Sequence, residues 1–127
     1  MRFVRGDVTR LQELGIGGGY TLLLDFGCFH TLPADQRAAY VASVSAVAAP
    51  GATFLLYGFA RPPRLAPMAA GLTLEEVRRR FAAAGWTLDV AEPVPADALR
   101  VAGARVDRSF ALWCYRLRRL PPPAAGA

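Results

Sequence analysis

The sequence contains no lysine and no asparagine, and it has one histidine and two cysteines. All fifteen basic residues are therefore arginines, and against ten acidic residues they give a net charge of +5. Cys28 and Cys114 lie far apart without a metal-ligand spacing, and no apolar targeting run opens the chain. Isolated cysteines and no visible signal peptide predict a reducing, cytoplasmic location and no metal site.

The arginines are spread along the chain apart from two groups, Arg78–Arg80 and the stretch 116–119. A positive charge can attract polyanions, but nucleic-acid binders gather that charge on one face or stripe. A nucleic-acid partner is therefore not expected. The run Arg78–Arg80 is interpreted as the solvated face of a helix, with phosphate binding as the alternative.

The longest uncharged stretch covers residues 38–60 and approaches the length that can cross a bilayer. Pro50 and Gly51 divide it into a helix-like half and a strand-like half, and hydroxyl side chains dilute it. We therefore expect two buried elements here and no membrane partner.

Alternating and periodic apolar residues predict strands at 2–8, 20–27, 52–59, 86–93 and 108–118. Helices are expected from Pro33 to the break at Pro50, and over 72–85, where Thr73 and Glu76 match a capping box. A helical turn over 9–15 would end at Gly15. Alternating strands and helices predict one α/β domain over 1–118, followed by a mobile tail at 119–127.

The stretch Glu13–Gly19, "ELGIGGG", has the pattern of a glycine-rich nucleotide-binding loop. Such a loop works where it joins a strand to the first turn of a helix, because the helix N-terminus then faces the nucleotide. Here polar, turn-like residues precede the glycines and a predicted strand follows them. We therefore interpret the stretch as a connector rather than a cofactor loop.

Five segments carry a resemblance to a known family: "GDVTRL" (6–11), "LLLDFGCFHTLP" (22–33), "R..Y" (37–40), "PGATFLLYGF" (50–59) and "GLTLEEVRRRFAAAGW" (71–86). Together they resemble class I S-adenosylmethionine (SAM)-dependent methyltransferases, and most of all the thiopurine-methyltransferase-like and tellurite-resistance-like subgroup. In that subgroup a strand ending in D-x-G-C-x-H and followed by L-P recurs.

The resemblance implies a truncated Rossmann-like sheet with helices on its faces. The family's strand order is 3-2-1-4-5-7-6, and this chain resembles strands 3-4-5-7-6, starting at Met1 where the third strand begins. The first strand, its glycine loop and the second strand have no counterpart. The strand at 20–27 would then be an exposed edge, which invites pairing with another chain. A homodimer or a complex with a partner is therefore expected.

The resemblance also implies a cofactor site for SAM. Asp7 would accept a hydrogen bond from the adenine amine beside Val8, or would instead cap the turn that follows it. The end of the strand at 20–27 would contribute Asp25, Phe26, Gly27 and Cys28, because ligands bind at the carboxyl ends of strands in open α/β sheets.

His30 is the catalytic candidate, because it is the only imidazole in the chain. The alternative is that His30 has only a structural role at the entry to a helix.

Two functions follow from these expectations. The chain is a methyltransferase acting on a small molecule when the missing N-terminal half is supplied, or it is a non-catalytic methyltransferase-like module for self-association or binding. A basic nucleic-acid binder is a third and weaker alternative.

Overall fold

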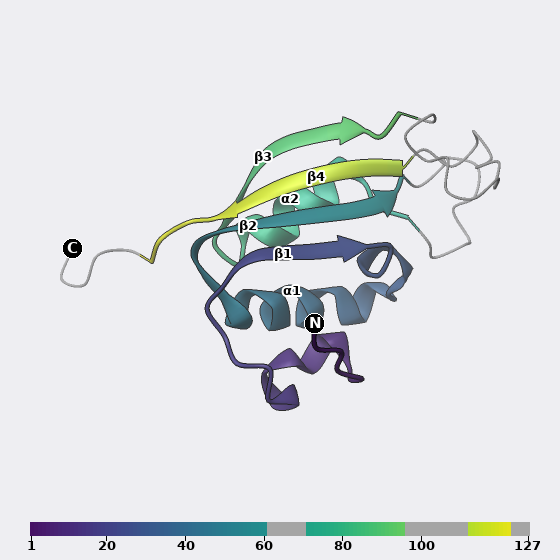
Figure 1. Cartoon of the computed structure of the whole chain (residues 1–127). Helices are drawn as coiled ribbons and strands as arrows, with labels where there is room; N and C mark the ends of the chain where they lie inside the picture. Colours follow the sequence, from purple (N-terminus) through teal and green to yellow (C-terminus); the bar gives the residue numbers. More distant parts are fainter. Residues whose placement is uncertain (61–70, 96–111, 123–127) are drawn as a thin grey trace.

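The computed structural model describes residues 1–60, 71–95 and 112–122. Its centre is a four-stranded sheet in the order β1-β2-β4-β3, formed by β1 (Tyr20–Phe26), β2 (Ala48–Phe59), β3 (Trp86–Pro93) and β4 (Leu112–Arg119). β1 and β2 are parallel, whereas β4 runs antiparallel to both β2 and β3 (Figure 1). The predicted α/β class and the antiparallel end of the sheet are confirmed.

The two α-helices begin where the sequence predicts. α1 (Ala34–Val47) follows Pro33, whose fixed φ suits the start of a helix. α2 (Leu74–Ala82) is capped by Thr73, whose side-chain oxygen accepts a hydrogen bond of 3.1 Å from the backbone N–H of Glu76.

Both helices pack on the same face of the sheet, as their shared packing against Phe54 shows. One continuous core joins Tyr40 and Val44 of α1 to Val77 and Phe81 of α2 through Phe54. The ring centroids of Phe54 and Phe81 lie 5.6 Å apart.

The opposite face of β1 is open. Because successive strand residues point to opposite faces, Leu23 and Asp25 turn toward α1, whereas Leu22, Leu24 and Phe26 turn away. These three side chains are 61%, 66% and 67% exposed. β1 is also the first strand of the sheet, with β2 as its only neighbour among the described strands. The prediction that this strand is an exposed edge is confirmed.

The predicted strand at 2–8 is wrong. Residues 1–7 form neither helix nor strand, and Phe3 is 87% exposed. The chain then enters η1 (Val8–Leu14), a 3-10 helix that packs beside α1 and ends at Gly15 with a left-handed φ of 65°. A strand is stable only beside a partner strand, and this segment pairs with none of the described strands.

The glycine-rich stretch links η1 to β1, so its interpretation as a connector is confirmed. The uncharged stretch 38–60 divides into a helix and a strand, as expected, but not at Pro50. α1 ends at Val47, and Pro50 and Gly51 lie within β2. No helix in the described ranges is long and apolar enough to cross a bilayer. β4 continues through Arg119, one residue into the predicted tail, and most of that tail, with residues 108–111 of the predicted strand, lies outside the described residues.

Candidate functional site

Asp25, at the end of β1, is buried and fastens the turn that follows it. One carboxylate oxygen accepts a 2.8 Å hydrogen bond from the N–H of Cys28, and the other accepts from the N–H of Phe29 at 3.0 Å. The Tyr40 hydroxyl of α1 donates a third bond to this carboxylate. Burial and the charge of Asp25 raise the pKa of Tyr40, so the phenol stays protonated as a donor. Asp25 therefore positions the loop with hydrogen bonds to both of its oxygens.

Gly27 makes the turn out of β1, with a φ of 94° that side chains rarely tolerate. Cys28 follows it and is partly buried. Burial, and next the negative charge of Asp25, raise the pKa of the Cys28 thiol. A thiol held in its protonated form is a poor nucleophile. Cys28 is therefore better suited to packing in the wall of the site than to acting as a nucleophile in covalent catalysis.

His30 lies in η2 (Phe29–Thr31) and is 6% exposed. Its ring stands edge-on to Phe59, with the centroids 5.2 Å apart. A Cβ added to Gly58 would lie 3.5 Å from Nδ1 of His30 and 2.7 Å from Leu72, so the glycine leaves room for the imidazole. Nδ1 is buried and has no hydrogen-bond partner among the described residues.

The pKa of His30 is lowered, first by burial and also by the charge of Arg37, although Asp25 acts in the opposite direction. The ring is therefore neutral at pH 7. A neutral imidazole with an unused ring nitrogen can accept a hydrogen bond or a proton.

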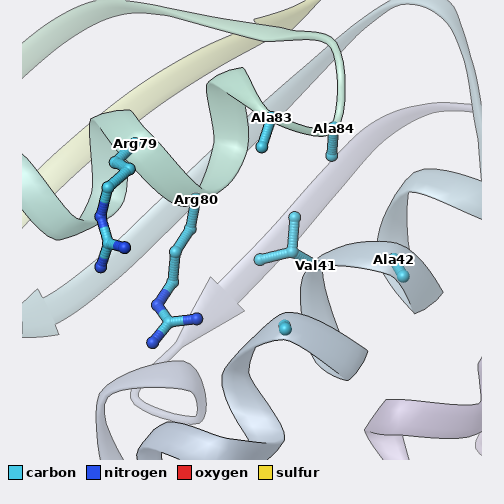
Figure 2. A pocket seen from close by; sticks show the side chains of 7 residues that line it. Val41, Ala42, Arg79, Arg80, Ala83 and Ala84 are labelled. Atoms are coloured by element: carbon cyan, nitrogen blue, oxygen red, sulfur yellow. The ribbon is translucent and has the colours of Figure 1, made fainter.

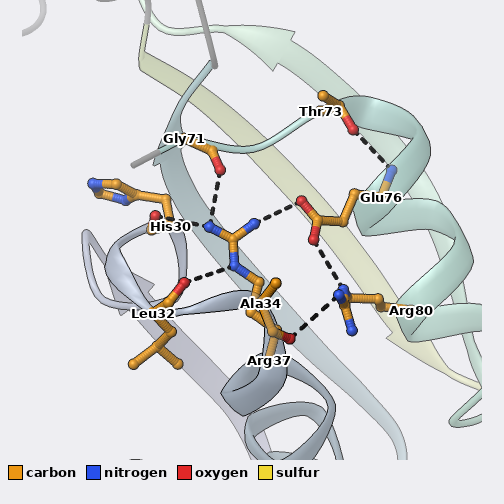
Figure 3. A network of polar contacts seen from close by, with 8 residues as sticks. All are labelled: His30, Leu32, Ala34, Arg37, Gly71, Thr73, Glu76 and Arg80. Atoms are coloured by element: carbon orange, nitrogen blue, oxygen red, sulfur yellow. Dashed lines mark hydrogen bonds and ion pairs between the residues drawn. The ribbon is translucent and has the colours of Figure 1, made fainter. Parts of the chain in front are cut away.

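Arg37 holds this loop against α2, and its role was not predicted from the sequence. It is 1% exposed, and its guanidinium donates to the backbone oxygens of His30, Leu32 and Gly71 at 3.0 to 3.1 Å (Figure 3). It also forms a 2.6 Å ion pair with Glu76 of α2. The only sequence signal was the R-x-x-Y spacing, which pairs Arg37 with Tyr40 among the segments of the resemblance.

A cavity of about 420 Å³ opens along β1 between η1 and α1. It brings together four of the predicted site residues, Val8, Asp25, Phe26 and Cys28. Its other lining residues are mostly apolar side chains of η1, β1 and α1. Gly27 and His30 are not among its lining residues, and neither is Asp7.

Asp7 is exposed and caps η1. Its carboxylate accepts hydrogen bonds from the N–H of Thr9 at 2.8 Å and from the Thr9 hydroxyl at 2.7 Å. These bonds lower the pKa of Asp7. The geometry matches the capping alternative, and Val8 beside it supplies the contact with the cavity.

A second cavity, of about 340 Å³, lies between α1 and α2 (Figure 2). Small alanine side chains and Val41 form its walls, and Arg79 and Arg80 extend beside it. Arg80 is bound to Glu76 at 3.0 Å, whereas Arg78 and Arg79 are exposed. None of the predicted site residues lies here. Among the described residues, no three His, Cys, Asp or Glu side chains gather as metal ligands.

Solved methyltransferases share this fold. A 1,6-didemethyltoxoflavin N1-methyltransferase of Burkholderia thailandensis, solved with 1,6-didemethyltoxoflavin and S-adenosylhomocysteine, matches 94% of this chain with a TM-score of 0.69 and 21% identity. A SAM-dependent methyltransferase of Methanosarcina mazei matches 92% at 0.70 and 11% identity. The magnesium protoporphyrin IX methyltransferase of Synechocystis, solved with S-adenosylhomocysteine, matches 90% at 0.62 and 11% identity.

The matches cover 51%, 66% and 49% of those three proteins, so this chain spans about half to two thirds of their length. No family model and no curated protein matches the sequence. The described residues therefore have the fold of a class I SAM-dependent methyltransferase, over part of that fold.

Proposed function

We propose that this chain is the C-terminal half of a SAM-dependent methyltransferase and transfers a methyl group to a small molecule when the other half is supplied. The supplier would be a second chain or an upstream segment of the same polypeptide. The observation that carries the proposal is the open edge of β1, which borders the apolar cavity in a fold shared with larger methyltransferases. The Asp25–His30 string supports the thiopurine and tellurite-resistance-like subgroup.

The residues of this chain fit one wall of a SAM site and not the whole of it. Val8, Phe26 and Cys28 line the cavity and offer apolar contact to an adenine ring. Asp25 is already bound to two backbone N–H groups and to Tyr40. The glycines of residues 15–19 lead into a strand, so they form no helix N-terminus for the cofactor.

His30 is the proposed proton acceptor. Methyl transfer depends mostly on in-line positioning and needs a base only when the attacking atom carries a proton. His30 is neutral, and its Nδ1 has no partner in the part of the chain that the structure describes. The residue lies at the carboxyl ends of β1 and β2, where ligands bind in open α/β sheets. An acceptor with a hydroxyl or amine group matches this chemistry.

The second candidate is a non-catalytic module of the same fold. It is supported by Asp25, whose two oxygens are both bound to groups of this chain and so have a structural role. The exposed apolar side chains of β1 also favour association over catalysis. In this case the cavity would hold another ligand or part of a partner.

Calorimetric titration with SAM tests the proposal. We expect no binding by the isolated chain at about millimolar SAM, and binding at about micromolar SAM once the segment with the first two strands and their glycine loop is present. The coding DNA upstream of Met1 shows whether that segment exists in frame. Micromolar binding by the isolated chain would support an enzyme but refute the need for a second half, and no binding in either form would favour the module.

A further inference from the structure

The outer edge of β1 carries neither the proline nor the exposed charge that often protects an edge strand. Such strands are commonly blocked by proline, by exposed charges or by a covering helix or loop. The sequence "YTLLLDF" of Tyr20–Phe26 has no proline and no basic residue, and its one charged residue, Asp25, is buried against Tyr40. β1 therefore presents an uncharged edge together with exposed leucine and phenylalanine side chains.

The strand is complementary to itself when it is read in the antiparallel direction about Leu23. In that register Leu23 lies opposite the partner's Leu23, Leu22 opposite the partner's Leu24, and Tyr20 opposite the partner's Phe26. Thr21 lies opposite the partner's Asp25, so no like charges face one another. Apolar and aromatic cross-strand pairs are the contacts that stabilise antiparallel sheets.

We propose that a second copy of this chain pairs with β1 in this antiparallel register. The two four-stranded sheets would then join through a twofold axis beside Leu23 into one continuous sheet. Leu22, Leu24 and Phe26 of both copies would form one apolar strip across the junction on the open face. The interface core would be depleted of charge, as stable interfaces are.

A second copy is favoured over an unrelated strand because the complementarity is internal to this sequence. Each exposed apolar residue of β1 meets an apolar residue of the same strand, and the exposed side chains lie on the same face in both copies. The pairing does not depend on methyltransferase activity. It does compete with the proposed function, because a strand from the missing half would use the same edge of β1.

Light scattering coupled to size exclusion tests the pairing at about 100 µM protein, a concentration at which a dimer with a Kd of about 10 µM or below is the main species. We expect the wild-type chain at twice its 13.6 kDa mass. The variants L22E and L24R should each run as monomers, because each puts a charge opposite an apolar residue of the partner. L74K, which changes an exposed leucine on α2, is the matched control and should remain dimeric.

Mixing the variants tests the register. L22E mixed with L24R should restore a dimer, because the two introduced charges lie opposite each other in this register. L22E mixed with L22R should restore it less well, because those positions are not opposed. A monomeric wild type, dimeric L22E and L24R variants with native circular dichroism, or equal rescue by both mixtures would overturn the proposal. SAM binding is measured separately, so either hypothesis can fail while the other stands.

Discussion

At the scale of single residues, Arg37 is the side chain on which the site most depends. Its guanidinium binds the backbone oxygens of His30, Leu32 and Gly71 and the carboxylate of Glu76. The variant R37M fills a similar volume but leaves these acceptors without their donor. Removing one partner of a buried ion pair costs about 3–5 kcal/mol, and we expect a loss of this size in the free energy of unfolding by urea.

The control for this prediction is R79A, which removes an exposed arginine of α2. Exposed substitutions of this kind usually change stability by less than about 0.5 kcal/mol. R37K separates charge from geometry, because a lysine ammonium cannot reproduce the planar fork of the guanidinium. Wild-type stability in R37K would show that the charge alone is sufficient and would contradict the prediction.

His30 makes the stability of the chain depend on pH. Burial lowers the pKa of its ring in the folded protein below the value of 6.5 of an unperturbed histidine. As the pH falls through 6.5, the unfolded chain takes up a proton that the folded chain does not, so the folded state loses stability. We expect the free energy of unfolding to fall as the pH is lowered from about 7 to 5.5.

The variant H30N provides the comparison, because His30 is the only histidine and carboxylates titrate mainly below this range. The slope of unfolding free energy against pH between 5.5 and 7 should disappear in H30N. A wild-type slope retained in H30N would assign the titration to another group and would contradict the burial of a neutral ring.

The residues at the end of β1 show how far the sequence could predict the site. The string from Asp25 to His30 predicted a strand end followed by a turn, because a glycine after an apolar strand favours a turn, and the chain turns at Gly27. The sequence did not show that both carboxylate oxygens of Asp25 accept hydrogen bonds from Cys28, Phe29 and Tyr40. Tyr40 lies in α1, well beyond the turn that follows Asp25. No local sequence pattern predicts a hydrogen bond between residues this far apart in the chain.

At the scale of elements, the cap of α2 is the feature that the sequence predicted most directly. The hydroxyl oxygen of Thr73 accepts a hydrogen bond of 3.1 Å from the backbone N–H of Glu76. The carboxylate of Glu76 forms ion pairs with Arg37 and Arg80. T73A should lower the free energy of unfolding by about 1 kcal/mol, because an orphan N–H of the first turn loses its acceptor. T73S keeps the acceptor and should recover most of this loss, as judged by urea unfolding. Equal losses in both variants would show that packing, and not the cap, is responsible.

The segment 2–8 was predicted as a strand and is not one, because a strand depends on a neighbour in a way that a helix does not. α2 carries its own signals, namely a cap and an apolar spacing within one segment. A strand has no such independence, because its hydrogen bonds are made to a neighbouring strand. Phe3 and Val4 are apolar residues that suit a strand, but both remain exposed and pair with no strand among the described residues.

At the scale of the whole molecule, the helices protect one face of the sheet and leave Leu22, Leu24 and Phe26 on the other. Pairing of β1 with a second copy would bury part of each of these side chains against its cross-strand neighbour, and an associated native state is stabilised by mass action. The midpoint of thermal unfolding should therefore rise with protein concentration. A tenfold increase in protein concentration stabilises the folded dimer by about 1.4 kcal/mol. This stabilisation raises the midpoint of thermal unfolding by roughly 2–4 °C for a chain of this size.

Calorimetric scans at about 10 and about 100 µM protein measure this shift, because the two concentrations differ tenfold. L24R should unfold at the same temperature at both concentrations, because Leu24 is exposed and its replacement removes association without disturbing the core. L74K should keep the wild-type dependence. A midpoint that does not change with concentration in the wild type would mean that the open face of β1 is stable in water without a second copy. The exposed edge of β1 would then be explained only by the missing N-terminal half of the proposed methyltransferase, whose strand would pair with it.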